Sequence, residues 1–112
     1  MGWQFRTVFV EVSGGTSVSD QNHPFLVEVN FGKPDKILEV RRAECALKSF
    51  HIGYKQSDHN FKYQRIAIRD VRIYGSAVHF NVQTSLKDDT DDANPYLGEV
   101  EVLVIADVYP DP

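Results

Sequence analysis

Residues Tyr63 to Leu86 read YQRIAIRDVRIYGSAVHFNVQTSL, and this pattern predicts a β-hairpin. After Gly75-Ser76, the strictly alternating apolar positions are Val78, Phe80, Val82 and Leu86. Before Gly75-Ser76, the apolar residues fall on two parities, Ile66 and Ile68 on one, and Ala67, Val71 and Ile73 on the other. Runs of period two on both sides of a two-residue Gly-Ser break are a strong hairpin signal.

The rest of the chain also has the pattern of strands. A return strand is predicted at residues 97–109, where one face carries Val100, Val102, Val104, Ala106 and Val108. Further strands are predicted at residues 3–13, 25–31, 37–42 and 46–54. Residues 36–48 are the one candidate helix, but the β-branched and aromatic residues after them favour a strand. The chain is thus predicted to be one domain, residues 1–112, with an all-β fold, an antiparallel β-sandwich of about six to seven strands.

The first predicted strand is apolar on both of its faces. Trp3, Phe5 and Phe9 share one parity, and Val8, Val10 and Val12 share the other. A strand with two apolar faces is typical of a strand that is covered on both sides. We therefore expect a neighbouring subunit to cover one of these faces.

The composition argues against several partners. Twelve Lys and Arg against 16 Asp and Glu give a net charge of −4, which disfavours nucleic acid because that affinity comes mainly from phosphate neutralisation. No apolar run approaches the ~18 residues of a spanning helix, so we expect no membrane insertion. The single cysteine, Cys45, allows no internal disulfide. No signal peptide is visible, and a soluble protein, either secreted or cytoplasmic, is expected.

The sequence offers little support for an enzyme. It has no Gly-x-Ser-x-Gly nucleophile elbow and no glycine-rich phosphate loop. Cys45 and His51 share a parity, but six residues of strand separate them by ~20 Å. The four histidines lack the paired spacing of a transition-metal site. We therefore predict that the protein is not an enzyme and has no cofactor.

An acidic loop follows the predicted hairpin. Its carboxylates are Asp88, Asp89, Asp91 and Asp92. Calcium prefers six to eight oxygen ligands from a tight loop, so a calcium site is the alternative to a solvated loop. The spacing is not that of the helix-loop-helix calcium motif, and no bidentate Glu follows. We expect a solvated loop, with a melting temperature that calcium leaves unchanged.

Aromatic residues near the predicted strand ends indicate a sugar site. Sugar sites join an apolar ring face to polar groups that fix orientation. Tyr54, Tyr63 and Tyr96 would supply ring faces, and His59 would add a planar ring. Further rings near predicted strand ends are those of Phe61, Tyr74 and His79. Asp58, Arg65 and Asp88 would bond hydroxyls, with Asn60 and Arg69 as further candidates. The alternative is that these rings pack at strand ends with their hydroxyls in water.

The sequence resembles the H-type lectin domain over residues 33–108. The matching segments are Gly32-Lys33-Pro34, residues 50–54, Asp58, residues 65–68, Val71, Gly75, residues 80–82 and residues 102–106. The resemblance implies a six-stranded antiparallel sandwich that forms homotrimers and binds N-acetylgalactosamine-like sugars. It carries Arg65 and Asp88 over to the sugar site. The family's Trp-containing sugar-site segment is replaced here by Ser85-Leu86-Lys87-Asp88.

Two functions of different classes follow from these patterns. The first is a carbohydrate-binding, lectin-like module that acts as a homotrimer, because several weak sites gain avidity when they are held together. The second is a structural or assembly domain of a larger complex or particle, with no small ligand. An apolar first strand suits both functions, because a large apolar surface on a protein usually marks a site that a partner covers.

Overall fold

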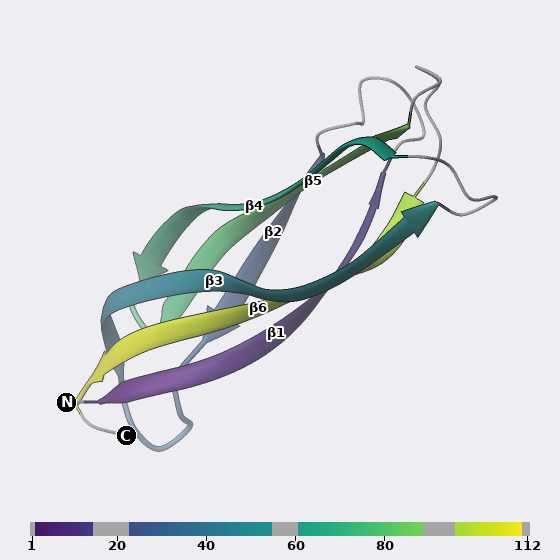
Figure 1. Ribbon diagram of the computed structural model, residues 1–112. Helices are drawn as coiled ribbons and strands as arrows, with labels where there is room; N and C mark the ends of the chain where they lie inside the picture. The colour runs from purple at the N-terminus through teal and green to yellow at the C-terminus, as the bar shows by residue number, and fades with distance from the viewer. Residues whose placement is uncertain (1, 15–22, 55–60, 89–95, 111–112) are drawn as a thin grey trace.

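The computed structural model describes residues 2–14, 23–54, 61–88 and 96–110, which contain six strands and no helix (Figure 1). The strands are β1 (Trp3–Gly14), β2 (His23–Asn30), β3 (Glu39–Tyr54), β4 (Phe61–Tyr74), β5 (Ala77–Asp88) and β6 (Tyr96–Tyr109). The predicted all-β, antiparallel sandwich is confirmed. Among the described residues, none belongs to a helix that could cross a membrane.

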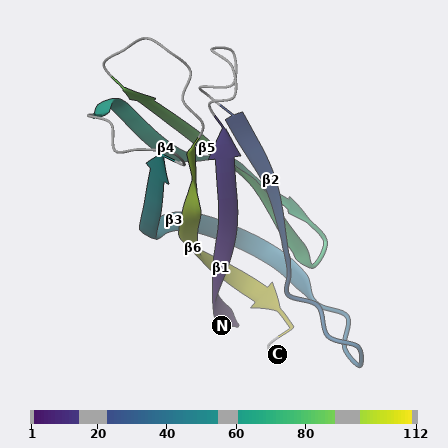
Figure 2. The ribbon, with the colours of Figure 1, turned by 90° about the vertical axis from the view of Figure 1, so that its right-hand side faces the viewer.

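The strands form two antiparallel sheets of three strands each. One sheet has the order β1-β6-β3 and the other has the order β2-β5-β4. Both sheets run along the long axis of a molecule that measures 53 × 21 × 20 Å (Figures 1 and 2). The hairpin β4–β5 therefore lies in one sheet, while the return strand β6 is the centre of the other.

The core lies between the two central strands, β5 and β6. The residues that the alternation placed on one face of β6 are buried, from Val100 to Val108 at every second position. Val78, Phe80 and Val82 of β5 are fully buried and belong to the same cluster. Each buried apolar side chain of this size contributes about 1.5–3 kcal/mol relative to exposure. The period-two pattern thus predicted the core-facing residues of both strands.

One predicted gap is absent from the structure. Residues 37–42 and 46–54 were predicted as separate strands, but β3 runs unbroken from Glu39 to Tyr54. Its pairing with β6 shifts register between Val40 and Arg42 and again between Leu47 and Ser49. A bulge changes which parity faces the core, so one long strand can carry an irregular apolar pattern.

The hairpin turn also joins the two sheets. Gly75 has a φ of +60° and Ser76 does not, which is the pattern of a type II′ turn with glycine at its first central position. The Gly75 carbonyl accepts a hydrogen bond of 2.8 Å from the amide of Val40 in β3. The Ser76 hydroxyl donates to Asn30 Oδ1 at 2.9 Å. The predicted Gly-Ser turn is therefore anchored to β2 and β3.

A bulge in β4 explains the two apolar parities of that strand. Between Arg69 and Arg72 the register with β5 shifts by one residue, and Asp70 within this step has a φ of 57°. Ile68 and Ile73, on opposite parities, therefore pair with Val82 and Val78, which share the core face. Because of the bulge, apolar side chains on opposite parities of β4 lie on the same face of the sheet.

The two faces of β1 differ in burial. Val10 and Val12 face the core and are buried, whereas Phe5 and Phe9 remain 64% and 60% exposed on the other face. Phe5 pairs with Ile105 of β6, which is half-buried on that same face. The part of this outer face around Phe5 and Phe9 is thus apolar and open in this single chain.

Candidate functional site

The sheet register brings the ends of the predicted sugar-site segments to one end of the molecule. Tyr54 pairs with Tyr96 across β3 and β6. Phe61 pairs with Asp88, and Tyr63 with Lys87, across β4 and β5. These strand ends meet at the upper right of Figure 1. The topology therefore gathers Tyr54, Tyr63, Asp88 and Tyr96 at this end.

Several predicted residues fall outside the described ranges. Asp58, His59 and Asn60 lie there, as do Asp89, Asp91 and Asp92 of the acidic loop. Arg65 lies on β4 opposite Ser85 and is exposed. The loop-end sugar site and the calcium alternative stay predictions.

The Tyr96 side chain is part of the core packing. Its side chain is fully buried, and its hydroxyl lies 3.0 Å from the Thr84 hydroxyl and 3.2 Å from the Thr84 carbonyl oxygen, to which it donates. Thr84 belongs to β5, so this contact links the two sheets. The buried ring presents no open face on which a sugar could stack.

Replacing Tyr96 with phenylalanine is expected to lower the free energy of unfolding by about 1–2 kcal/mol. The change keeps the ring but leaves the buried Thr84 hydroxyl without this partner. Urea unfolding followed by circular dichroism measures the effect. An unchanged unfolding midpoint would contradict the structural role given to the Tyr96 hydroxyl.

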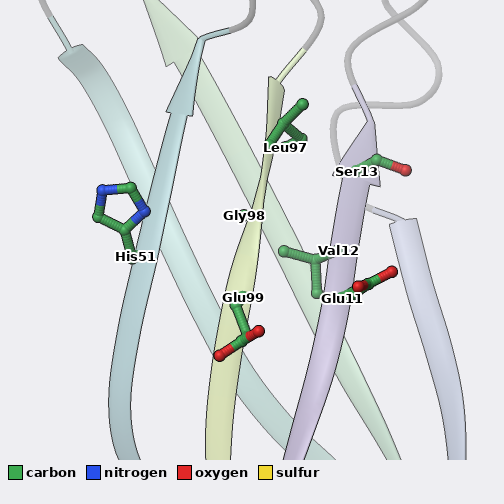
Figure 3. Close-up of a pocket in the computed structure, with 7 residues that line it drawn as sticks. All are labelled: Glu11, Val12, Ser13, His51, Leu97, Gly98 and Glu99. Carbon is green, nitrogen blue, oxygen red and sulfur yellow. The ribbon is translucent and has the colours of Figure 1, made fainter.

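The hollow in Figure 3 lies on the outer face of the β1-β6-β3 sheet. Glu11, Glu99 and His51 form one row across its three strands. The three side chains point away from one another (Figure 3). No group of three His, Cys, Asp or Glu that could hold a metal occurs among the residues with described positions. This row therefore does not form a metal site.

Cys45 has the environment of a structural thiol. It pairs with Val104 of β6 and packs against the core. Desolvation by burial raises the pKa of the Cys45 thiol from 9.0 to about 11. A nucleophile must be a thiolate, so Cys45 is unsuited to nucleophilic chemistry near neutral pH.

Cys45 is expected to make stability fall between about pH 9 and pH 11. The raised pKa means that the unfolded chain loses the thiol proton first, so the folded state is disfavoured as pH rises through this window. Below pH 9.0 both states hold the proton and the effect is absent. Urea unfolding of the protein and of a Cys45→Ala variant measures it. A constant difference between the two proteins from about pH 7 to pH 11 would contradict this expectation.

A second hollow lies on the outer face of the β2-β5-β4 sheet. Its volume is about 230 Å³. The residues that line it are Leu26, Asp70, Arg72, Tyr74, His79 and Asn81. We call it the Tyr74 hollow. Leu26 comes from β2, His79 and Asn81 come from β5, and the others come from β4, so all three strands contribute.

The aromatic part of the Tyr74 hollow is a tilted ring pair. The Tyr74 and His79 ring centroids lie 4.7 Å apart with an interplanar angle of 52°. Tyr74 is 54% exposed, so much of its side chain remains open to solvent. His79 Nε2 also lies 3.7 Å from Glu28 Oε1 of β2, an ion pair when the imidazole is protonated. The His79 ring is therefore contacted on two sides.

The polar part of the Tyr74 hollow is held by the bulge. Asn81 Nδ2 donates a hydrogen bond of 3.1 Å to Asp70 Oδ2. The left-handed backbone of Asp70 is uncommon outside glycine, and such conformations persist where the surrounding structure holds them. The Asp70 carboxylate and the Asn81 amide are thus held beside an exposed ring, and the exposed Arg72 also lines the hollow.

This arrangement can bind a small polyol. A ring face accepts the apolar side of a sugar, while carboxylate and amide groups accept and donate hydrogen bonds to hydroxyls. The volume is below the about 300–1,000 Å³ of drug-sized pockets, so a ligand would make few contacts. Any ligand held here would therefore be small and bound weakly.

Sequence reasoning placed the rings but missed the site. Tyr74 and His79 were recognised as planar groups, and Asp70 and Asn81 were not. The missing information was the bulge next to Arg69, the residue opposite Asn81, which places the Asp70 carboxylate within hydrogen-bond distance of the Asn81 amide. The signal in the sequence is the change of apolar parity between Ile68 and Val71, with an aspartate, a residue tolerant of left-handed backbone, between them.

Comparison with protein-family models, with curated proteins and with solved structures finds no match.

Proposed function

We propose that the protein is a carbohydrate-binding, lectin-like module that acts as a homotrimer. The observation that carries this proposal is the Tyr74 hollow, where an exposed ring lies beside the hydrogen-bonded Asp70 and Asn81. An apolar ring face with a few oriented polar groups is the usual composition of a small-ligand site. The resemblance to H-type lectin domains supports the same function.

Oligomerisation follows from the weakness of one such site. Few contacts give low affinity, and several linked sites recover it through effective concentration. The apolar outer face of the β1-β6-β3 sheet supplies a surface for assembly, since Trp3, Phe5 and Phe9 are exposed on it. This face and the Tyr74 hollow belong to different sheets and lie on opposite sides of the sandwich. Copies that associate through this face would therefore leave the hollow open.

A structural or assembly domain is the second candidate function. The same exposed Trp3, Phe5 and Phe9 favour it, because a contiguous apolar patch on a soluble protein marks an interaction surface. In that case the sandwich would serve assembly alone, and the Tyr74 hollow would bind nothing.

A glycan array probed with the multimeric protein tests the first function. We expect a defined set of glycans to bind. Complete silence from a folded oligomer would reject carbohydrate binding and leave the assembly domain. Light scattering measures the oligomeric state in the same samples, and a monomer at micromolar concentration would contradict both functions.

A further inference from the structure

Three arginines form one row on the outer face of β4. Arg65, Arg69 and Arg72 pair with Ser85, Asn81 and His79 of β5. Arg65 and Arg69 are four residues apart and share a face. Arg72 joins that face because the Asp70 bulge adds one residue to β4. We call this set the arginine row, and all three of its side chains are exposed.

The arginine row differs from the other three arginines of the chain in its contacts. Arg6 lies 4.7 Å from the Phe31 ring centroid, and Arg41 lies 3.9 Å from that of Tyr109. Arg42 pairs with Asp107 at 3.8 Å. Within the described ranges, no salt bridge or ring contact engages a guanidinium of the arginine row. The row is therefore available to an external anion.

Among the residues that the structure describes, the two carboxylates on this face have partners of their own. Asp70 accepts the hydrogen bond from Asn81, and Glu28 lies beside His79. Neither is paired with the arginine row. Cationic groups are thus presented without a salt bridge on a protein whose net charge is −4. Such a local concentration of one charge type favours a ligand of the opposite charge.

The length of the arginine row points to an extended ligand. Four strand residues from Arg65 to Arg69 span about 13 Å, and the step to Arg72, which matches two residues of β5, adds about 7 Å. A single small anion would contact one guanidinium. A chain with anionic groups at intervals would contact the row, and guanidinium groups bind carboxylates and sulfates through paired hydrogen bonds.

We infer that the protein prefers acidic glycans, with a sugar in the Tyr74 hollow and sulfate or carboxylate groups along the arginine row. This inference rests on the proposed carbohydrate-binding function and names its ligand class. Arg72 belongs both to the row and to the hollow, so the two surfaces are continuous. The net charge of −4 acts against every polyanion alike, so the single-stranded DNA arm of the test below separates a glycan from a nucleic acid.

The test compares binding of the oligomeric protein to immobilised heparin, to chemically desulfated heparin, to neutral glycans and to single-stranded DNA. The variant is Arg65→Gln/Arg69→Gln, which leaves every residue lining the Tyr74 hollow intact. The control is Lys33→Gln/Arg41→Gln, which makes the same change in net charge at exposed positions elsewhere. Thermal melting checks that both variants are folded.

We expect heparin binding that weakens with salt, falls at least about tenfold in the Arg65→Gln/Arg69→Gln variant and is unchanged in the control. Equal losses in both variants, or DNA binding as tight as heparin binding, would overturn the acidic-glycan inference. Binding of neutral glycans without any preference for heparin would also overturn it and leave the proposed function standing. Silence towards every glycan would reject both.

Discussion

Phe80→Ala is expected to lower the free energy of unfolding by about 3–5 kcal/mol. Phe80 is fully buried near the start of β5, and it belongs to the cluster formed by both sheets. Removing its ring loses transfer free energy and leaves a cavity that rigid strands fill only in part. A domain of this kind has about 5–15 kcal/mol of total stability, so the variant would lose much of it.

Urea unfolding measures the Phe80→Ala effect, with Ile37→Ala as the matched control. Ile37 is also apolar, but it is 94% exposed, and surface changes of this kind stay within about 0.5 kcal/mol. A loss below about 1 kcal/mol for Phe80→Ala would mean that the two sheets do not pack around β5 as described.

Gly98→Ala is expected to destabilise the protein by about 1–3 kcal/mol or more. A Cβ atom at Gly98 would lie 2.6 Å from the Ile52 Cα and would also overlap the carbonyl oxygen of His51. Both obstacles are backbone atoms of β3, so they cannot move aside as a flexible side chain could. The glycine thus allows β3 to approach β6 closely.

Gly53→Ala is the control for Gly98→Ala. Gly53 is on β3, next to the residue that pairs with Gly98, and an added Cβ there meets nothing within 4 Å. Alanine at such a site restricts the unfolded chain and is neutral or stabilising by up to about 1 kcal/mol. Thermal melting compares the stability of the two variants. Equal melting temperatures would show that the close approach of β3 to β6 is absent.

The fold was predictable because burial in a sandwich follows a period of two. Val78, Phe80 and Val82 alternate without interruption, and all three are buried. The prediction failed in detail where a bulge interrupts that period, as in β3, which the irregular apolar pattern divided in two. Which sheet β6 joins depends on contacts between distant residues, and local alternation does not encode them.

The candidate site was less predictable because its parts come from different strands. Leu26, Asp70 and His79 belong to β2, β4 and β5, and only the register places them together. The sequence did indicate that aromatic rings lie near strand ends. It could not indicate that Tyr96 is turned into the core towards Thr84 while Tyr74 is turned outward, because both residues occupy similar places in their segments.

The most direct measurement is isothermal titration of the protein with the glycan that binds best on the array, comparing Tyr74→Ala with Tyr109→Ala. The two tyrosines are almost equally exposed, at 54% and 52%, but Tyr109 lies at the end of the other sheet. We expect Tyr74→Ala to weaken binding at least about tenfold, because it removes the exposed ring face, and Tyr109→Ala to leave it unchanged. Equal affinity in the two variants would contradict a sugar site at the Tyr74 hollow.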